Sequence, residues 1–143
     1  MYGGCDEKLS GEGKITGFKR VKFIYILRIF MCMKISKGDI VRINKGFGGL
    51  IRNEASLDFA LKQQKNKKLG DYKKLAYLFR AILVDHPFSD GNKRTAMFLA
   101  LAFADESRKE VNRNLLLHHI LSIASKNITH IRAIEERLKN AIK

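Results

Sequence analysis

A short stretch, residues 86–96, places a histidine, a carboxylate, a glycine turn and two cations close together. Pro87 follows His86 and is expected to end the helix that precedes it. Gly91 can open a tight turn, and an apolar run begins at Ala96, so the turn is expected to lead into a helix. The N–H groups and the dipole of a helix N-terminus together favour a bound anion.

The side chains around this turn indicate what the anion would be. Lys93 and Arg94 stand beside the turn, and two cations suit a polyphosphate better than a lone carboxylate. The carboxylate of Asp90 can hold a divalent metal that bridges phosphate oxygens. The imidazole of His86 can remove a proton from an attacking hydroxyl. The stretch therefore indicates group transfer from a nucleotide to a hydroxyl.

This stretch resembles the active-site motif of the Fic/Doc (death-on-curing) family. The family motif is His, any residue, Phe, any residue, an acid, Gly or Ala, Asn, Gly or Lys, then Arg. Each fixed position is matched here, by His86, Phe88, Asp90, Gly91, Asn92, Lys93 and Arg94. The competing interpretation is a helix–turn–helix junction that contains an incidental Asp-Gly turn.

The resemblance implies a transferase that modifies a Ser, Thr or Tyr hydroxyl of a target protein, with ATP or another nucleotide triphosphate as co-substrate and Mg²⁺ as cofactor. His86 would be the catalytic base and Asp90 the metal ligand, while Phe88 would anchor the loop in the core. The nucleotide phosphates would be bound by Gly91, Asn92, Lys93 and Arg94.

Two positions favour the Doc branch, whose toxins transfer a terminal phosphate rather than AMP. Family members that transfer AMP usually carry a second arginine where this chain has Met97, and tend to have glycine where it has Lys93. Gly91 points the other way, because Doc itself has alanine there, so AMP transfer stays as the alternative. We find no clear copy of the family's inhibitory Ser/Thr-x-x-x-Glu-Gly/Asn segment. A toxin of this type would then be restrained by a separate antitoxin protein.

A glycine-rich segment upstream of the motif predicts a β-hairpin or flap. The resemblance implies that this flap lies over the site and pairs with the backbone of the target by β-strand addition. An ordinary glycine-rich loop is the alternative, and spacing alone would favour it. The predicted target-binding flap consists of Phe47, Gly48, Gly49, Leu50, Ile51 and Arg52.

Apolar periodicity predicts an all-α, Fic/Doc-like bundle of about six helices with the small β-hairpin flap. Helices are expected near residues 36–44, 53–65, 71–86, 92–106, 112–124 and 129–142. Ser36, Asp71, Asn112 or Asn114, and Thr129 are the predicted N-caps. The helix at 92–106 is apolar on nearly all sides, so we expect it at the centre of the bundle.

The net charge of +14 would attract nucleotides, nucleic acid, acidic proteins or anionic membrane, and does not choose among them. A non-catalytic nucleic-acid- or partner-binding protein is therefore the alternative from another class. Because the lysines are scattered and the phenylalanines fall at core spacing, no stable nucleic-acid complex is expected.

Residues 1–32 are predicted to form a flexible extension, basic and apolar, ahead of a Fic/Doc domain at residues 33–143. The apolar run at 21–33 is too short and too charged to span a bilayer. We interpret Met31 or Met33 as the true start. The two cysteines, Cys5 and Cys32, show no metal-ligand or disulfide pattern, so a cytoplasmic location is expected.

Overall fold

The computed structural model describes residues 35–143. The predicted extension at 1–32, and the suggested start at Met31 or Met33, lie outside these residues. The described part folds into six helices: α3 (Lys37–Lys45), α4 (Ala55–Gln64), α5 (Asp71–Leu83), α6 (Asn92–Glu106), α7 (Arg113–Ser125) and α8 (Ile131–Ala141). The all-α class and the six helices expected from periodicity are confirmed for this part of the chain.

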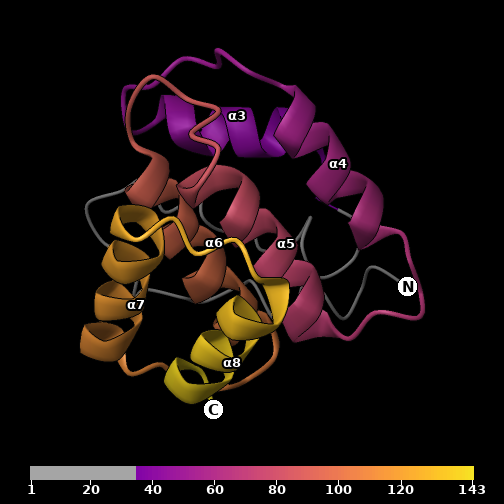
Figure 1. Ribbon diagram of the computed structural model, residues 1–143, viewed down its shortest axis with the longest axis vertical. Coiled ribbons are helices and arrows are strands. Elements are labelled where there is room, and N and C mark those ends of the chain that lie inside the picture. Colours follow the sequence, from indigo (N-terminus) through magenta and orange to yellow (C-terminus); the bar gives the residue numbers. More distant parts are fainter. Residues whose placement is uncertain (1–34) are drawn as a thin grey trace, which may run out of the picture.

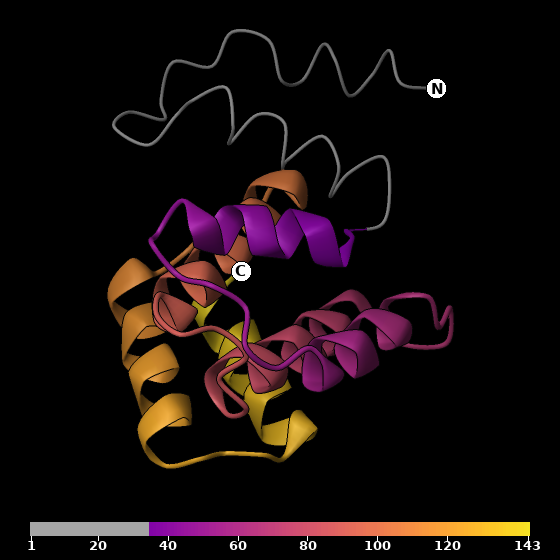
Figure 2. The same ribbon diagram turned by 90° about the horizontal axis from the view of Figure 1, so that it is seen from above.

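Helix α5 lies at the centre and contacts α4, α6, α7 and α8 (Figure 1). Its apolar residues recur on one face, and each has less than a few per cent of its surface exposed: Leu75, Leu78, Phe79, Ile82 and Leu83. Figure 2 shows α4 beside α5 and α7 beside α8, so that two helical hairpins enclose much of the core. The helical period of the sequence accounts for this packing, because it places one apolar stripe against four neighbours.

Helix α6 contacts α3, α5 and α7. Its buried residues point in several directions around the axis, as expected for a helix that is apolar on most sides: Thr95, Ala96, Phe98, Leu99, Ala100, Ala102, Phe103 and Ala104. The N-terminus of α6 is therefore mounted on a packed, rigid element. Across residues 35–143, none of the helices has the length and apolar character that a membrane span requires.

Helix α3 begins with a capping box. The N–H of Asp39 donates to Ser36 Oγ at 3.2 Å, and the N–H of Ser36 donates to Asp39 Oδ2 at 2.9 Å. These bonds satisfy two of the donors that a helix start leaves unpaired. The N-cap predicted at Ser36 is thus confirmed, and it fixes the start of the helix that carries Asn44 to the site.

The predicted β-hairpin is wrong: within the described residues the segment forms no strand pair of its own. The N–H groups of Gly46, Phe47 and Gly48 donate back to carbonyls of α3, so the chain leaves the helix through consecutive turns. Gly48 has a φ of 88°, which glycine adopts without strain. Only the short piece that follows is extended, and it makes a single antiparallel bridge, between Ile51 and Phe88. The glycines therefore end a helix instead of turning a hairpin.

Three helix boundaries differ from the prediction. Helix α5 ends at Leu83, so Pro87 lies in a loop and does not itself terminate the helix. Gly70, not Asp71, is the N-cap of α5, and its carbonyl accepts from the N–H of Lys74 at 3.0 Å. His130, not Thr129, is the N-cap of α8. At both starts a backbone carbonyl closes the first turn without a side-chain cap, which composition alone cannot reveal.

Candidate functional site

The loop at residues 84–91 joins α5 to α6 and carries the motif. His86 is exposed and has a φ of 49°, in the left-handed region. That conformation costs a residue with a Cβ about 1–2 kcal/mol, and residues strained in this way concentrate at functional sites. Phe88 is completely buried. The loop therefore exposes its histidine and fixes itself to the core two residues later.

Asn92, the first residue of α6, fastens this loop by its side chain. Its Oδ1 accepts from the N–H of Phe88 at 3.2 Å, and its Nδ2 donates to the carbonyl of Phe88 at 3.0 Å. An amide that both accepts from and donates to one residue fixes the direction of the backbone there. The Asn92 side chain is thus engaged with the loop, and what it offers a phosphate is its backbone N–H.

Asn44, near the end of α3, joins that helix to the motif, and sequence reasoning missed it. Its Nδ2 donates to the carbonyl of Asp90 at 2.8 Å and to Thr95 Oγ1 at 3.1 Å. Asn44 and Thr95 are both fully buried. The signal in the sequence was a polar residue on the apolar face of α3, next to Ile40 and Ile43. A buried amide is costly unless it is bonded, so its position on that face pointed to a partner.

The predicted flap pairs with the motif loop. The N–H of Arg52 donates to the carbonyl of Pro87 at 2.7 Å, and the N–H of Ser89 donates to the carbonyl of Leu50 at 2.8 Å. Because successive residues of an extended chain point their polar groups to opposite edges, the N–H and C=O of Ile51 face away from the motif. They have no partner among the described residues, and the Leu50 side chain is 69% exposed.

Gly49 and Gly91 allow the flap and the motif to approach closely. A Cβ on Gly49 would collide with Asn44 Oδ1 and the carbonyl of Asp90. A Cβ on Gly91 would lie 3.0 Å from Asn44 Nδ2 and 3.1 Å from Phe47 Cβ, and the φ of Gly91 is 76°. Gly49 therefore has no room for a Cβ, and the positive φ and tight contacts at Gly91 favour glycine there.

Asp90, in the loop just before α6, lies close to Arg94 in the first turn of that helix. Asp90 Oδ1 accepts from the N–H of Gly91 at 2.8 Å, and its Oδ2 lies 3.7 Å from Nη2 of Arg94. The Arg94 guanidinium also lies over the ring of Phe47, 5.6 Å from its centre. Both charged side chains are more than half exposed. A phosphate can therefore reach the guanidinium, and a cation can reach the carboxylate.

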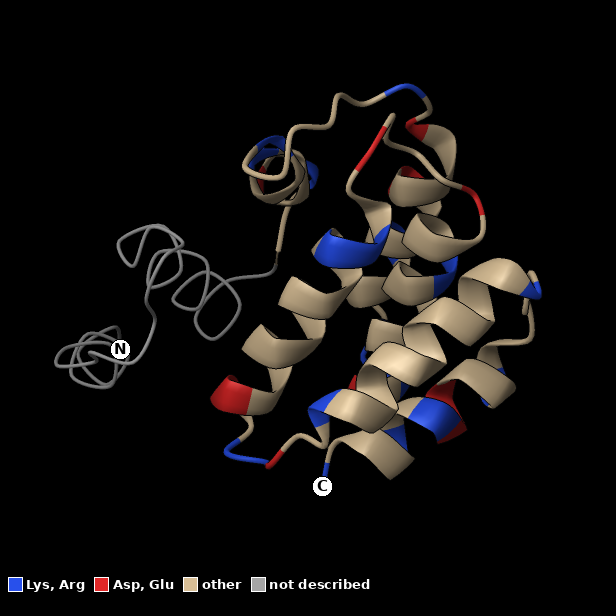
Figure 3. Cartoon of the chain, turned by 90° about the vertical axis from the view of Figure 1, so that its left-hand side faces the viewer, with Lys and Arg blue, Asp and Glu red and all other residues tan. Residues whose placement is uncertain are grey.

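The charges of α6 are arranged against its dipole. The first turn carries Lys93 and Arg94 and no acid, whereas the last turn carries Asp105 and Glu106 and no base. Figure 3 shows blue at the start of this helix and red at its far end. Each such charge is unfavourable by about 0.3–1 kcal/mol. A bound anion at the N-terminus would reverse that effect, so the arrangement fits a phosphate site.

The start of α6 also lacks a cap. Gly91 has no side chain to bond the first-turn N–H groups, so the amides of Asn92, Lys93 and Arg94 are available to a ligand. Lys93 is exposed beside them. Backbone amides and two cations thus form a phosphate cradle, defined here as Gly91, Asn92, Lys93 and Arg94.

Asp90 fits a Mg²⁺ ion that arrives with a nucleotide. Residues 35–143 contain no group of three or more acidic, histidine or cysteine side chains arranged to hold a metal. Magnesium bound to nucleotides needs no such cage, because phosphates and water supply most of its ligands and one carboxylate suffices from the protein. The exposed Asp90, one residue before the cradle, satisfies that requirement.

Comparison with known proteins agrees with this geometry. Residues 35–104 match the family described as Fic/DOC. The matched region runs from the residue before the capping box of α3 to near the end of α6, and so includes the flap and the whole motif loop. No curated protein and no solved structure matches the chain.

The pair of hydrogen bonds between the Asn92 side chain and the Phe88 backbone predicts a specific loss of stability when one of them is removed. Asn92→Asp keeps the shape and the acceptor but removes the donor, so a carboxylate oxygen would face the Phe88 carbonyl. We expect the free energy of unfolding to fall by about 1–3 kcal/mol in urea denaturation. Asn66→Asp is the matched control, because Asn66 Oδ1 only accepts, from the N–H of Lys68 at 2.9 Å. Equal losses in both variants would contradict the assigned role.

The left-handed backbone at His86 predicts an unusual order of stabilities. His86→Gly should be more stable than His86→Ala by about 1 kcal/mol, because only glycine adopts this φ without strain. At Glu136, exposed within α8, the alanine variant should be the more stable by about the same amount. Thermal unfolding of the four proteins measures both differences. An alanine advantage at residue 86 would show that His86 is not strained.

Proposed function

We propose, from the match of residues 35–104 to the Fic/DOC family, that the chain is a protein-modifying transferase. It would move a phosphate-containing group from a nucleotide triphosphate to a hydroxyl of a target protein. The observation that supports this most is the start of α6, where uncapped amides and two cations meet without an acid in the same turn. That site suits the polyphosphate of a nucleotide and not a neutral ligand.

The reaction assigns a separate task to each part of the motif. The cradle binds and orients the phosphates, and its N–H groups and cations offset charge that develops as the phosphorus is attacked. His86 takes the proton from the target hydroxyl, whose oxygen forms the new bond to phosphorus. The remaining nucleotide or pyrophosphate leaves with the electrons of the broken P–O bond. When bound, Mg²⁺ supplies further charge neutralisation at the phosphate oxygens, and Asp90 holds it.

We favour transfer of the terminal phosphate, as in the Doc branch. The cradle contains two cations, and Met97 is partly buried against the core, where it contributes no charge. A nucleotide with its γ-phosphorus presented to His86 needs fewer cations than one whose β- and γ-phosphates are both held deep in the site. Gly91 is weak support for AMP transfer in this chain, because its φ and the proximity of Asn44 and Phe47 already favour glycine.

The target would bind along the flap. Ile51 presents an N–H and a C=O at the edge that faces away from the motif, which is the arrangement that β-strand addition uses. The exposed Leu50 gives the target an apolar contact beside this edge. Main-chain hydrogen bonds to Ile51 would hold the target. The motif loop pairs with the other edge of the flap, so His86 would keep a fixed position relative to the bound target.

A non-catalytic nucleic-acid-binding protein is a weaker explanation of the charge. Four phenylalanines have little or no exposed surface and cannot stack on bases: Phe79, Phe88, Phe98 and Phe103. Within residues 35–143, lysines and arginines are spread over several helices and form no single stripe (Figure 3). We extend the transferase proposal to a toxin restrained by a separate antitoxin and acting in the cytoplasm, the setting that the Doc resemblance implies.

His86→Ala should abolish transfer without loss of fold. Its side chain is exposed and makes no hydrogen bond within residues 35–143, so its proposed role is proton removal and not packing. We expect a rate loss of about 10²–10⁴-fold, measured as label transfer from ATP to protein in a lysate that supplies the target. His130→Ala, an N-cap without a side-chain bond, is the control. Full activity in a folded His86→Ala protein would reject the proposed base.

ATP labelled separately at the α- and γ-phosphates distinguishes the two branches. We expect label on the target from the γ position only. The two cations of the cradle suit a nucleotide that presents its γ-phosphorus to His86, since that orientation needs fewer cations than AMP transfer does. Label from the α position only would overturn phosphotransfer and establish the AMP transferase. Absence of label from either, with Mg²⁺ present and the chain folded, would contradict the transferase proposal as a whole.

A further inference from the structure

The flap is held to the motif loop by two hydrogen-bonded residue pairs, one on either side of the bridge between Ile51 and Phe88. In the first pair, the N–H of Arg52 donates to the carbonyl of Pro87 at 2.7 Å. Such a pair in an antiparallel ladder normally exchanges two backbone bonds. Pro87 has no N–H, so it cannot return a bond to Arg52. Backbone pairing alone therefore leaves this pair half complete.

The second pair, Leu50 and Ser89, is completed by a side chain. The N–H of Ser89 donates to the carbonyl of Leu50 at 2.8 Å, and the N–H of Leu50 donates to Ser89 Oγ at 3.0 Å. A hydroxyl oxygen thus takes the place of the backbone carbonyl that would normally accept this bond. The Leu50 N–H makes no other hydrogen bond within residues 35–143. Its pairing therefore depends on the side chain at position 89, where the family motif accepts any residue.

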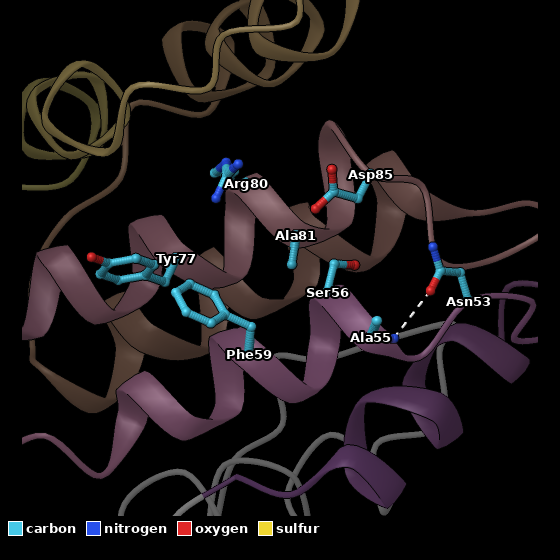
Figure 4. A pocket seen from close by; sticks show the side chains of 8 residues that line it. All are labelled: Asn53, Ala55, Ser56, Phe59, Tyr77, Arg80, Ala81 and Asp85. Carbon is cyan, nitrogen blue, oxygen red and sulfur yellow. Dashed lines mark hydrogen bonds between the residues drawn. The ribbon is translucent and has the colours of Figure 1, made fainter.

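The downstream end of the flap is anchored without Ser89. Asn53, which follows Arg52, donates its N–H to the carbonyl of Pro87 at 3.2 Å. Its side-chain Oδ1 accepts from the N–H of Ala55 at 3.1 Å, at the start of α4 (Figure 4). This end of the flap is therefore joined both to the motif loop and to a helix.

The upstream end of the flap has fewer restraints. The N–H of Gly49 donates to the carbonyl of Asn44 at 3.3 Å, and the only further hydrogen bonds before Arg52, among the residues described, are those of Leu50. The Leu50 side chain is 69% exposed, so burial adds little to them. The chain between Gly49 and Arg52 is therefore held in place chiefly by Ser89.

Ser89 itself stands on a fixed support. Phe88, directly before it, is completely buried. Both backbone polar groups of Phe88 are bonded to the side chain of Asn92, at 3.2 Å and 3.0 Å. The hydroxyl of Ser89 is thus an acceptor presented by the anchored loop, and the flap takes its position from that loop.

We propose that Ser89 is a positioning residue for the target: its hydroxyl holds Leu50 and so keeps the adjacent open edge of Ile51 in the orientation that a target strand needs. This inference rests on the proposed function, which assigns that edge to the target. A flap released at Leu50 would present the edge for only part of the time, and the apparent affinity for the target would be reduced by that fraction. Ser89 therefore acts on target binding and not on the proton transfer at His86.

A direct contact between the hydroxyl and the target is the competing explanation, because Ser89 is exposed and its O–H can still donate. The two explanations differ in the protein without a target. Only a positioning role makes the order of Ile51 depend on the hydroxyl in the free chain, since Ile51 makes no bond to Ser89 itself.

The first measurement uses the full chain alone and compares backbone amide order parameters from NMR relaxation in Ser89→Ala and the unaltered protein. The values at Leu50 and Ile51 should fall from about 0.85 toward about 0.6, the values of rigid and flexible backbone. Arg52 is the internal control, because its bond to Pro87 remains. Ser89→Thr keeps the hydroxyl oxygen and should restore the order. Unchanged order at Ile51 in Ser89→Ala would overturn the positioning role.

The second measurement follows label transfer from ATP while the lysate that supplies the target is diluted. In Ser89→Ala the half-saturating lysate concentration should rise about 3–10-fold, the effect of one lost hydrogen bond, and the rate at saturation should change less. Ser89→Thr should behave as the unaltered chain. Ser125→Ala, an exposed serine at the end of α7, is the matched control. A half-saturating concentration that does not move, or a loss confined to the rate at saturation, contradicts the role in target binding.

Failure of this inference is distinguishable from failure of the proposed function, because the order parameters need neither ATP nor a target. Loss of order at Ile51 in a chain that transfers no label would leave Ser89 as a residue that holds the flap, and would reject both the transferase and the target role. Label transfer by the unaltered chain, with Ser89→Ala unchanged in both measurements, would keep the transferase and reject Ser89 as its positioning residue.

Discussion

The buried amide of Asn44 is the interaction on which the site depends. It joins α3 to the carbonyl of Asp90 and to the hydroxyl of Thr95, and none of its surface is exposed. Each bond contributes about 1 kcal/mol, but removal of the amide would also leave buried partners unpaired. Because one bond reaches the residue before the cradle and the other enters the first turn of α6, Asn44 sets where α6 begins relative to α3. The capping box at the other end of α3 makes that helix a fixed support.

The flap and the motif loop are then fastened to each other by backbone bonds. The flap offers one edge to the motif loop, through Leu50 and Arg52, and keeps the other edge, at Ile51, open. A single extended residue in this arrangement can connect a bound strand with the loop that carries His86. Glycine at 49 and 91 makes the close approach possible, since a Cβ at either place would meet Asn44. The helix end, the flap and the motif are therefore one packed unit and not three loops.

The sequence predicted the helices well because their apolar residues recur with a helical period, as the burial of Leu75, Leu78 and Ile82 on α5 shows. It could not reveal where backbone groups bond. The glycine-rich segment at 46–49 predicts a hairpin, but in the structure it closes the end of α3. The two outcomes differ in which carbonyls accept from its backbone N–H groups, and side-chain types do not determine that. Similarly, Asn44 and Asn92 are ordinary asparagines in the sequence, and only the fold brings their amides to Asp90 and Phe88. The motif residues could be predicted because their spacing is specific; the residues that hold the motif are distant in sequence and have no such pattern.

A titration of the full chain with ATP and Mg²⁺, followed by backbone amide NMR at low temperature, tests directly whether the start of α6 binds the phosphates of a nucleotide. The largest shifts should occur at the amides of Gly91, Asn92, Lys93 and Arg94. Helix α7 supplies an internal comparison, because it also starts with a cation, Arg113, but its N-terminus is capped by Asn112, whose Oδ1 accepts from the N–H of Leu115 at 3.0 Å. Saturable shifts at α6 and none at α7 are the predicted result. Shifts of similar size at both helix starts, or spread over the basic surface, would contradict phosphate binding at the start of α6.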